Sequence, residues 1–269
     1  MANEAKTSQL FRKLLREKGY YDDKDIVVEE QQAAAGKLAK LLQNASKSGA
    51  GKGFPDFIIT SGRYPSLVIV VECKADTRKH ESETLDSFRD YAMDGALLYA
   101  SFLSKEYDVI AIGFSGEKET DTRLSHFLQL SEERDAHRYF QDGVLLPLDD
   151  YYHGLMESNY KFNQDFGKLI DYTKEVNEEL HDKKIKERLR GLLISGILIA
   201  LKNDRFKAEY KNYRTTQDLV TNLYNSIKAE LQGSDVPEGT KQKLIRGFDF
   251  ILTSSSINDS SAEAKKYLT

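Results

Sequence analysis

Two acidic residues and one lysine occupy positions that a β-hairpin would bring together. Asp56 begins the apolar segment 56–60, and Glu72 and Lys74 end the apolar segment 67–74. Alternate side chains of a strand share a face, so Glu72 and Lys74 point the same way, about 7 Å apart along the strand. Turn residues between the two segments predict a hairpin that sets Asp56 opposite the residue before Glu72, within one position. The three side chains are therefore expected to converge at one end of a sheet.

Two such carboxylates beside one ammonium indicate a site for a divalent cation. Burial of Asp56 next to Glu72 is costly unless positive charge neutralises them, and Lys74 offsets only part of this cost. Mg²⁺ takes one or two carboxylates together with waters and substrate phosphate oxygens, and the Cys73 carbonyl offers a further oxygen. In a site of this kind the metal polarises a phosphodiester, while the lysine orients or deprotonates the attacking water. The alternative is a structural salt bridge between Glu72 and Lys74, with Asp56 as a cap of the turn.

The segment Phe54-Pro55-Asp56, followed after fifteen residues by Glu72-Cys73-Lys74, resembles the signature of the PD-(D/E)xK nucleases. The resemblance covers roughly residues 8–130. It implies that Asp56 and Glu72 bind Mg²⁺, with Mn²⁺ as a substitute, and that Lys74 activates water. It also implies a restriction-endonuclease-like three-layer sandwich with a central mixed sheet.

Two further features of that family have candidates in this chain. Many members carry an acidic residue on the helix before the hairpin, and here Glu29 and Glu30 are candidates, with Glu30 preferred. Either could instead complement a helix dipole. Some members carry Gln-x-x-x-Tyr on the helix after the lysine strand; Tyr99 is present here, but Gly95 stands in place of the glutamine. Core packing is the preferred interpretation of Tyr99.

A narrower resemblance is to restriction-modification polypeptides in which a nuclease domain precedes a helical connector and an N6-adenine methyltransferase. The segments that carry it are 44–47, 91–97, 109–116 and 192–201. It implies double-stranded DNA as substrate, a transient homodimer on DNA, and S-adenosylmethionine only in methyltransferase and specificity parts that this sequence lacks. The alternatives are a DNA-binding module of the same fold without cleavage activity, a repair or recombination nuclease of that fold, and a purely structural α/β domain.

Hydrophobic periodicity predicts the elements that would position these residues. An α/β domain over 1–150 is expected to contain the hairpin, helices at 8–19, 29–45 and 82–103, and strands at 107–114 and 124–130. Helical patterns then dominate, which predicts an all-α domain over 151–269. Its expected helices are 160–180, 183–202, 215–232 and 238–252.

The charge distribution bears on a nucleic-acid partner. The net charge is −4, yet between Lys37 and Lys79 eight Lys and Arg residues stand against three acids, a local excess of five. Lys47, Lys52 and Arg78 are the candidate contacts to DNA phosphates. The alternatives are solvated surface lysines and, for Lys47 and Lys52, a mobile loop.

The remaining composition narrows the class of protein. Cys73 is the only cysteine, so an internal disulfide is excluded and a cytoplasmic protein is expected, with a buried and inert thiol. No apolar run approaches the roughly 18 residues that span a bilayer, so no membrane partner is expected. The five histidines show no spacing typical of zinc ligands.

Overall fold

The structure is a computed structural model that describes residues 4–31, 36–49 and 51–258. The chain divides into two compact units, Met1–Asp165 and Phe166–Thr269. The boundary expected between residues 150 and 151 lies within α4 (Leu148–Met156), whose buried side chains belong to the core of the first unit.

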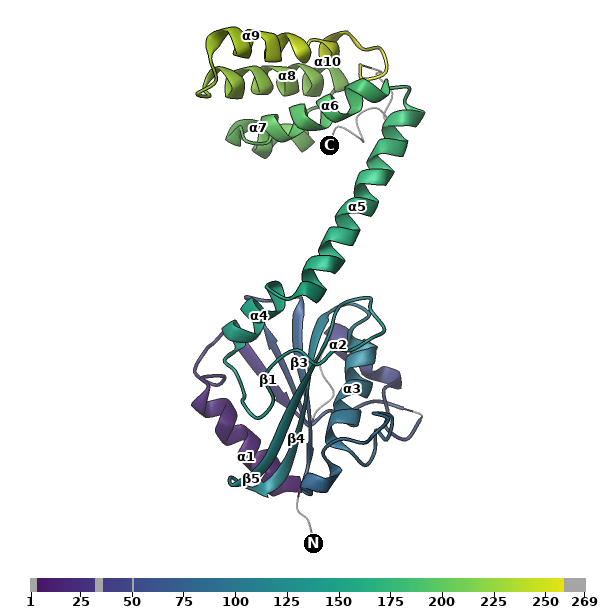
Figure 1. Cartoon of the computed structure of the whole chain (residues 1–269), viewed down its shortest axis with the longest axis vertical. Helices are drawn as coiled ribbons and strands as arrows, with labels where there is room; N and C mark the ends of the chain where they lie inside the picture. The colour runs from purple at the N-terminus through teal and green to yellow at the C-terminus, as the bar shows by residue number, and fades with distance from the viewer. Residues whose placement is uncertain (1–3, 32–35, 50, 259–269) are drawn as a thin grey trace. The chain divides into compact units, whose positions relative to one another are not determined.

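The first unit is built on a five-stranded mixed sheet (Figure 1). Its strands, in their order across the sheet, are β1 (Ile26–Glu30), β2 (Phe57–Ser61), β3 (Leu67–Lys74), β4 (Asp108–Lys118) and β5 (Asp121–Gln129). The pair β3 and β4 is parallel, and the other neighbouring pairs are antiparallel. The parallel pair requires a crossover connection, and this connection contains α3 (Ala92–Leu103).

Helices cover both faces of this sheet, and side-chain alternation decides which residues meet them. On one face α1 (Glu4–Glu17) packs Phe11 and Leu15 against Phe57, Val71 and neighbouring side chains. On the other face α3 packs against the intervening strand residues, among them Ile58, Val68 and Val70. The strand β3 is buried on both faces, as its uninterrupted apolar sequence predicts. These observations confirm the α/β class.

Two expected helices of this unit differ from the observed structure. The segment 29–45 instead begins in β1, and its helical part is short: α2 (Gly36–Leu41) followed by the 3₁₀ helix η1 (Leu42–Asn44). Residues 32–35 of the expected helix lie outside the described part of the chain. The edge strand forms because Ile26–Glu30 pairs along its whole length with β2, a tertiary interaction that outweighs local helix propensity.

The expected helix 82–103 begins ten residues later, at Ala92. Asp94, in its first turn, accepts hydrogen bonds from the backbone N–H groups of Ser82 and Ser87 and from the Ser82 hydroxyl. This carboxylate therefore holds the preceding loop in a folded but non-helical conformation. Another short 3₁₀ helix, η2 (Thr77–Lys79), follows β3.

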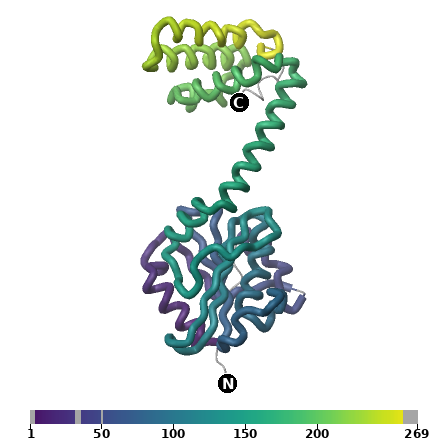
Figure 2. The backbone as a smooth tube through the Cα atoms, in the orientation of Figure 1, coloured from purple at the N-terminus to yellow at the C-terminus, as the bar shows by residue number. Residues whose placement is uncertain are grey.

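In the described part of the second unit every regular element is helical. They are the last part of α5 (Asn159–Asp182), α6 (Glu187–Ala200), α7 (Asp204–Glu209), η3 (Tyr210–Asn212), α8 (Thr216–Gln232), α9 (Glu238–Gly247) and α10 (Phe250–Thr253). In the trace of Figure 2, α8 runs beside both α6 and α9. Leu193, Leu223, Ile227 and Phe248 contribute to their shared core. The expected helices 160–180, 183–202 and 215–232 are present, and the expected helix 238–252 is divided into α9 and α10. The helices α4 and α7 were not predicted.

None of the helices in the described ranges is both long and apolar enough to cross a membrane.

Candidate active site

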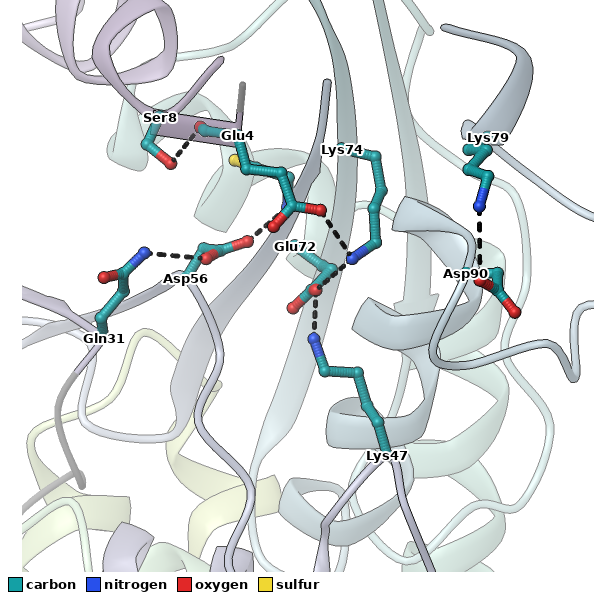
Figure 3. Close-up of polar contacts among 10 residues, drawn as sticks. Glu4, Ser8, Gln31, Lys47, Asp56, Glu72, Lys74, Lys79 and Asp90 are labelled. Atoms are coloured by element: carbon teal, nitrogen blue, oxygen red, sulfur yellow. Dashed lines mark hydrogen bonds and ion pairs between the residues drawn. The ribbon is translucent and has the colours of Figure 1, made fainter. Parts of the chain in front are cut away.

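Asp56, Glu72 and Lys74 meet at one end of the β2–β3 hairpin (Figure 3). Phe57 is opposite Val71 in the antiparallel register, so the next position along sets Asp56 opposite Glu72. Both residues, with Lys74 two positions further along β3, share the face that α3 covers. The predicted convergence of these three residues is confirmed.

Asp56 is fixed by the strand next to it. Its Oδ2 accepts a hydrogen bond from the backbone N–H of Cys73 at 2.7 Å, and its Oδ1 lies 3.4 Å from Nε2 of Gln31. Burial raises the pKa of Asp56, and the Cys73 N–H, Lys47 and Lys74 oppose that rise. The carboxylate is therefore held rigidly in an environment that disfavours its charge in the absence of further cations.

Glu72 is the most deeply buried carboxylate of the site, with 1% of its surface exposed. Two ammonium groups, those of Lys47 and Lys74, form ion pairs with its Oε1 atom, the second at 3.5 Å. Its Oε2 atom is buried and has no hydrogen-bond partner among the described residues. Burial and the nearby Asp56 raise the pKa of Glu72 to about 7, although Lys47 and Lys74 oppose this rise.

Gly95 of α3 makes the burial of Glu72 possible. A Cβ atom added at Gly95 would lie 3.0 Å from Cγ of Glu72 and 3.0 Å from the carbonyl oxygen of Phe88. Gly95 stands where the resemblance noted in the sequence would place a glutamine, and its missing side chain leaves room for the glutamate. Tyr99, one turn further along α3, is buried in the core of that face, as preferred from the sequence.

Lys74 has a second carboxylate neighbour that the sequence did not reveal. Its Nζ lies 3.1 Å from Oε1 of Glu4 and 3.5 Å from Oε1 of Glu72, so it bridges two carboxylates (Figure 3). Glu4 belongs to the first turn of α1, which begins four residues before the predicted start at Ser8. An acidic residue shortly before an amphipathic helix was the available signal, since such residues favour the first helical turn.

Glu30, the preferred fourth acidic residue, is not part of the site. It ends β1 on the face of α1, where it forms an ion pair with Arg12 at 2.6 Å and accepts a hydrogen bond from the Tyr21 hydroxyl. Its expected place at a helix start is wrong because the segment is a strand. Glu29 points to the opposite face, and its carboxylate has no hydrogen bond or ion pair with another described residue. The acidic residue that reaches Lys74 is Glu4.

The three candidate DNA-contacting residues lie in different environments. Lys47 points into the site and pairs with Glu72, so it is not a surface lysine. Lys52 is exposed on the loop before β2. Arg78 is exposed in η2 but its guanidinium is engaged by Asp76 at 2.7 Å. Of these three candidate residues, the structure brings only Lys47 to the carboxylates of the site.

The side chain and the backbone of Cys73 face different surroundings, as expected for a strand residue. Its side chain is 1% exposed in the core beneath α1, and burial raises the pKa of its thiol, which fits an inert group. Its backbone N–H points to Asp56. In a strand the N–H and C=O of one residue face the same neighbour, so the Cys73 carbonyl belongs to the edge that carries Asp56.

These groups fit a magnesium ion better than a softer metal. The described residues contain no cluster of three or more His, Cys, Asp or Glu side chains arranged to hold a metal. Mg²⁺ does not require such a cage, since one or two carboxylates, a carbonyl and waters suffice. The buried Oε2 of Glu72 has no partner within the described ranges and carries negative charge when ionised, which is the property of an oxygen that accepts a cation. Asp56 and Glu72 would hold the ion, with the Cys73 carbonyl as a third oxygen.

Comparisons of the chain with protein-family models, with curated proteins and with solved structures found no match.

Proposed function

We propose that the first unit is a magnesium-dependent phosphodiesterase. The observation that carries this proposal is the buried Glu72 beside Asp56, with one carboxylate oxygen lacking a partner and two lysines at the other oxygen. A structural salt bridge would pair both oxygens of a buried glutamate, because an unsatisfied buried charge is destabilising. The arrangement is therefore better explained as a cation site than as a device for stability.

Each residue has a role that follows from its contacts. Asp56, oriented by the Cys73 N–H, and Glu72 supply the oxygens for Mg²⁺. The bound ion would polarise the phosphodiester and favour a nucleophilic water. The Lys74 ammonium lies between Glu4 and Glu72, and from there it can orient that water by donating a hydrogen bond to it. It can take up the water's proton only after passing one of its own to a neighbouring carboxylate, so its role would be that of a relay. Glu4 limits the rotamers of Lys74.

The more specific proposal is a DNA endonuclease of the restriction type, with a restriction-endonuclease-like sandwich. The order of helix, hairpin, helix and strand in the first unit and the intact Asp56, Glu72 and Lys74 support it, as does the resemblance of the chain to restriction-modification polypeptides. The helices from Phe166 onward would form the all-α connector to a methyltransferase. On this proposal Lys52 and Arg78 contact DNA phosphates, and two copies of the chain cut the two strands. S-adenosylmethionine acts only in the methyltransferase and specificity parts of the system.

Cleavage of supercoiled plasmid DNA tests this proposal. The intact chain should nick or linearise the plasmid with Mg²⁺ or Mn²⁺ and remain inactive with chelator, because the carboxylates need the ion. Asp56→Asn should lose this activity. Asp135→Asn is the matched control, since Asp135 is exposed and lies outside the site.

The other outcomes separate the alternatives. Cleavage that survives in Asp56→Asn would contradict the assigned site. A chain that binds duplex DNA but cuts it with neither metal would favour the binding module. Preferential cleavage of branched or damaged duplexes over intact plasmid would favour a repair or recombination nuclease.

A further inference from the structure

A short loop between η1 and β2 carries a lysine into the site. Backbone hydrogen bonds close this loop at its base, from Gly53 N–H to the Leu42 carbonyl at 2.8 Å and from Ser46 N–H to the Gly51 carbonyl at 3.1 Å. Gly53 is enclosed there, because an added Cβ would lie 2.6 Å from the Ala45 carbonyl oxygen. The loop therefore has fixed ends, and Lys47 stands just inside the first of them.

The side chain of Lys47 runs across an aromatic ring to reach Glu72. Its Nζ lies 5.8 Å from the ring centroid of Tyr99 and forms an ion pair with Oε1 of Glu72. Only 24% of the side chain is exposed, which is unusual for a loop lysine. Figure 3 shows Lys47 and Lys74 approaching Glu72 from different directions, the first from the loop and the second from the strand.

In the absence of a divalent cation, two ammonium groups face the buried carboxylates of the site. Lys47 and Lys74 together compensate the two carboxylates of Asp56 and Glu72. A divalent cation at these carboxylates adds two positive charges and repels both ammonium groups. Lys74 is fixed by β3 and held by Glu4, whereas Lys47 is on a loop and forms no second ion pair with the described residues. Lys47 is therefore the group that can move.

We propose that Lys47 is a second active-site lysine, which occupies Glu72 before the cation binds and then contacts the phosphodiester of the substrate. This inference rests on the proposed function. A bound phosphodiester brings negative charge to the carboxylates, within reach of a lysine that has just lost its partner. A compact ammonium there stabilises the charge that develops on the phosphate oxygens during hydrolysis. Lys74 serves the attacking water and Lys47 the phosphate.

Metal affinity and cleavage test this assignment together. Mn²⁺ binding should be measured calorimetrically at pH 8.5 for the intact chain, Lys47→Met, Lys47→Arg and Lys40→Met, and plasmid cleavage should be measured for the same proteins. Lys47→Met should bind Mn²⁺ roughly fivefold more tightly or better, because a competing charge is gone. It should nevertheless cleave roughly 10²-fold more slowly, because the phosphate has lost a charged donor.

The other variants serve as controls. Lys47→Arg keeps the charge, so its Mn²⁺ affinity should stay close to that of the intact chain and part of the cleavage should remain. Lys40→Met removes an exposed positive charge of α2 and should change neither quantity.

The outcomes distinguish this inference from the proposed function. Equal Mn²⁺ affinity of the intact chain and Lys47→Met would overturn the inference alone, as would an unchanged rate of cleavage. An intact chain that binds no Mn²⁺ would contradict the proposed function and remove the basis for the inference.

Discussion

Two buried polar clusters of the first unit, one around Glu72 and one around His80, differ in how completely their polar atoms are paired. His80 is 1% exposed, and each ring nitrogen lies 2.9 Å from a serine hydroxyl, Nδ1 from Ser115 and Nε2 from Ser125. Glu72 is equally buried, yet one of its oxygens has two ammonium neighbours and the other has no partner among the described residues.

The difference separates a buried polar group whose hydrogen bonds are all made within the fold from one that the fold leaves partly unpaired. Serine hydroxyls can donate or accept, so the neutral His80 ring is fully satisfied. Burial lowers the pKa of His80 to about 4, with a smaller contribution from the positive charge of Arg123, and this keeps the ring neutral. The Glu72 cluster is incompletely paired, since one carboxylate oxygen has no partner among the described residues, and burial and Asp56 disfavour the charge that the lysines favour. The His80 network is therefore complete without a ligand, whereas the Glu72 cluster leaves one buried oxygen without a partner among the described residues.

The largest effect expected from this comparison is on catalysis. Lys74→Met should reduce plasmid cleavage by roughly 10²–10⁴-fold, because the attacking water loses its donor and proton relay. Thermal unfolding should show a lower stability at pH 8, because the buried Glu72 loses one of its two ammonium partners, so cleavage is compared per folded molecule. Ser115→Ala is the counterpart in the His80 cluster and should leave cleavage per folded molecule unchanged. Equal cleavage by Lys74→Met and the intact chain would remove Lys74 from the active site.

A substitution of Gly95 should show how closely α3 is fitted over the glutamate. Gly95→Ala places a Cβ 3.0 Å from Cγ of Glu72, so the free energy of unfolding should fall by about 1–3 kcal/mol despite the better helix propensity of alanine. The control is Gly191→Ala in α6, where an added Cβ meets no atom within 4 Å. That variant should be stabilised by up to about 1 kcal/mol. Urea unfolding of both measures the contrast, and a stabilised Gly95→Ala would refute the close packing.

The His80 cluster should respond to the loss of one hydroxyl. Ser115→Ala leaves His80 Nδ1 without its hydrogen-bond partner in a buried site, so the free energy of unfolding should fall by about 1–2 kcal/mol at pH 8. The pKa of His80 is lower in the folded chain than in the unfolded one. Its contribution is therefore complete above the usual histidine pKa of 6.5 and is lost as the pH falls towards about 4. A substitution without effect at pH 8 would show that the cluster does not stabilise the fold.

The contribution of Glu72 to stability should depend on pH with the opposite sign to that of His80. Its pKa is raised from 4.5 to about 7, so its favourable contribution is complete below pH 4.5 and is lost as the pH rises through 7. Without metal, Glu72→Gln should therefore stabilise the fold by about 1 kcal/mol at pH 8, because the unfavourable buried charge is gone while two lysines lose a partner. The gain should be smaller at pH 5. Urea unfolding in chelator measures both, and a destabilised Glu72→Gln at pH 8 would identify the glutamate as a structural ion-pair partner.

The sequence was sufficient for the residues that strand periodicity positions. Alternation along β3 fixes Glu72 and Lys74 on one face, and the short hairpin fixes Asp56 opposite them. The error at Glu30 has the same physical origin. Residues 26–30 read Ile-Val-Val-Glu-Glu, and as an edge strand they turn Glu30 towards Arg12 and α1. The choice between strand and helix there depends on pairing with β2, which local sequence does not specify.

Contacts made by chain ends and loops could not be predicted in this way. Glu4 reaches Lys74 because α1 begins earlier than its apolar face indicates. Lys47 reaches Glu72 because the loop is closed by backbone hydrogen bonds at Ser46 and Gly53, and these have no periodic signature in the sequence. The hairpin residues at the centre of the site could therefore be predicted from local sequence, whereas Glu4 and Lys47, which come from other elements, could not.

Calorimetric titration of Mn²⁺ tests most directly the central claim that Asp56 and Glu72 form a cation site. The intact chain should show a saturable site that is lost in Asp56→Asn and retained in Ser115→Ala, where the neighbouring polar cluster has been disturbed instead. Absence of Mn²⁺ binding by the intact chain, or equal binding by Asp56→Asn, would contradict the account and leave the carboxylates and lysines as a structural ion-pair network.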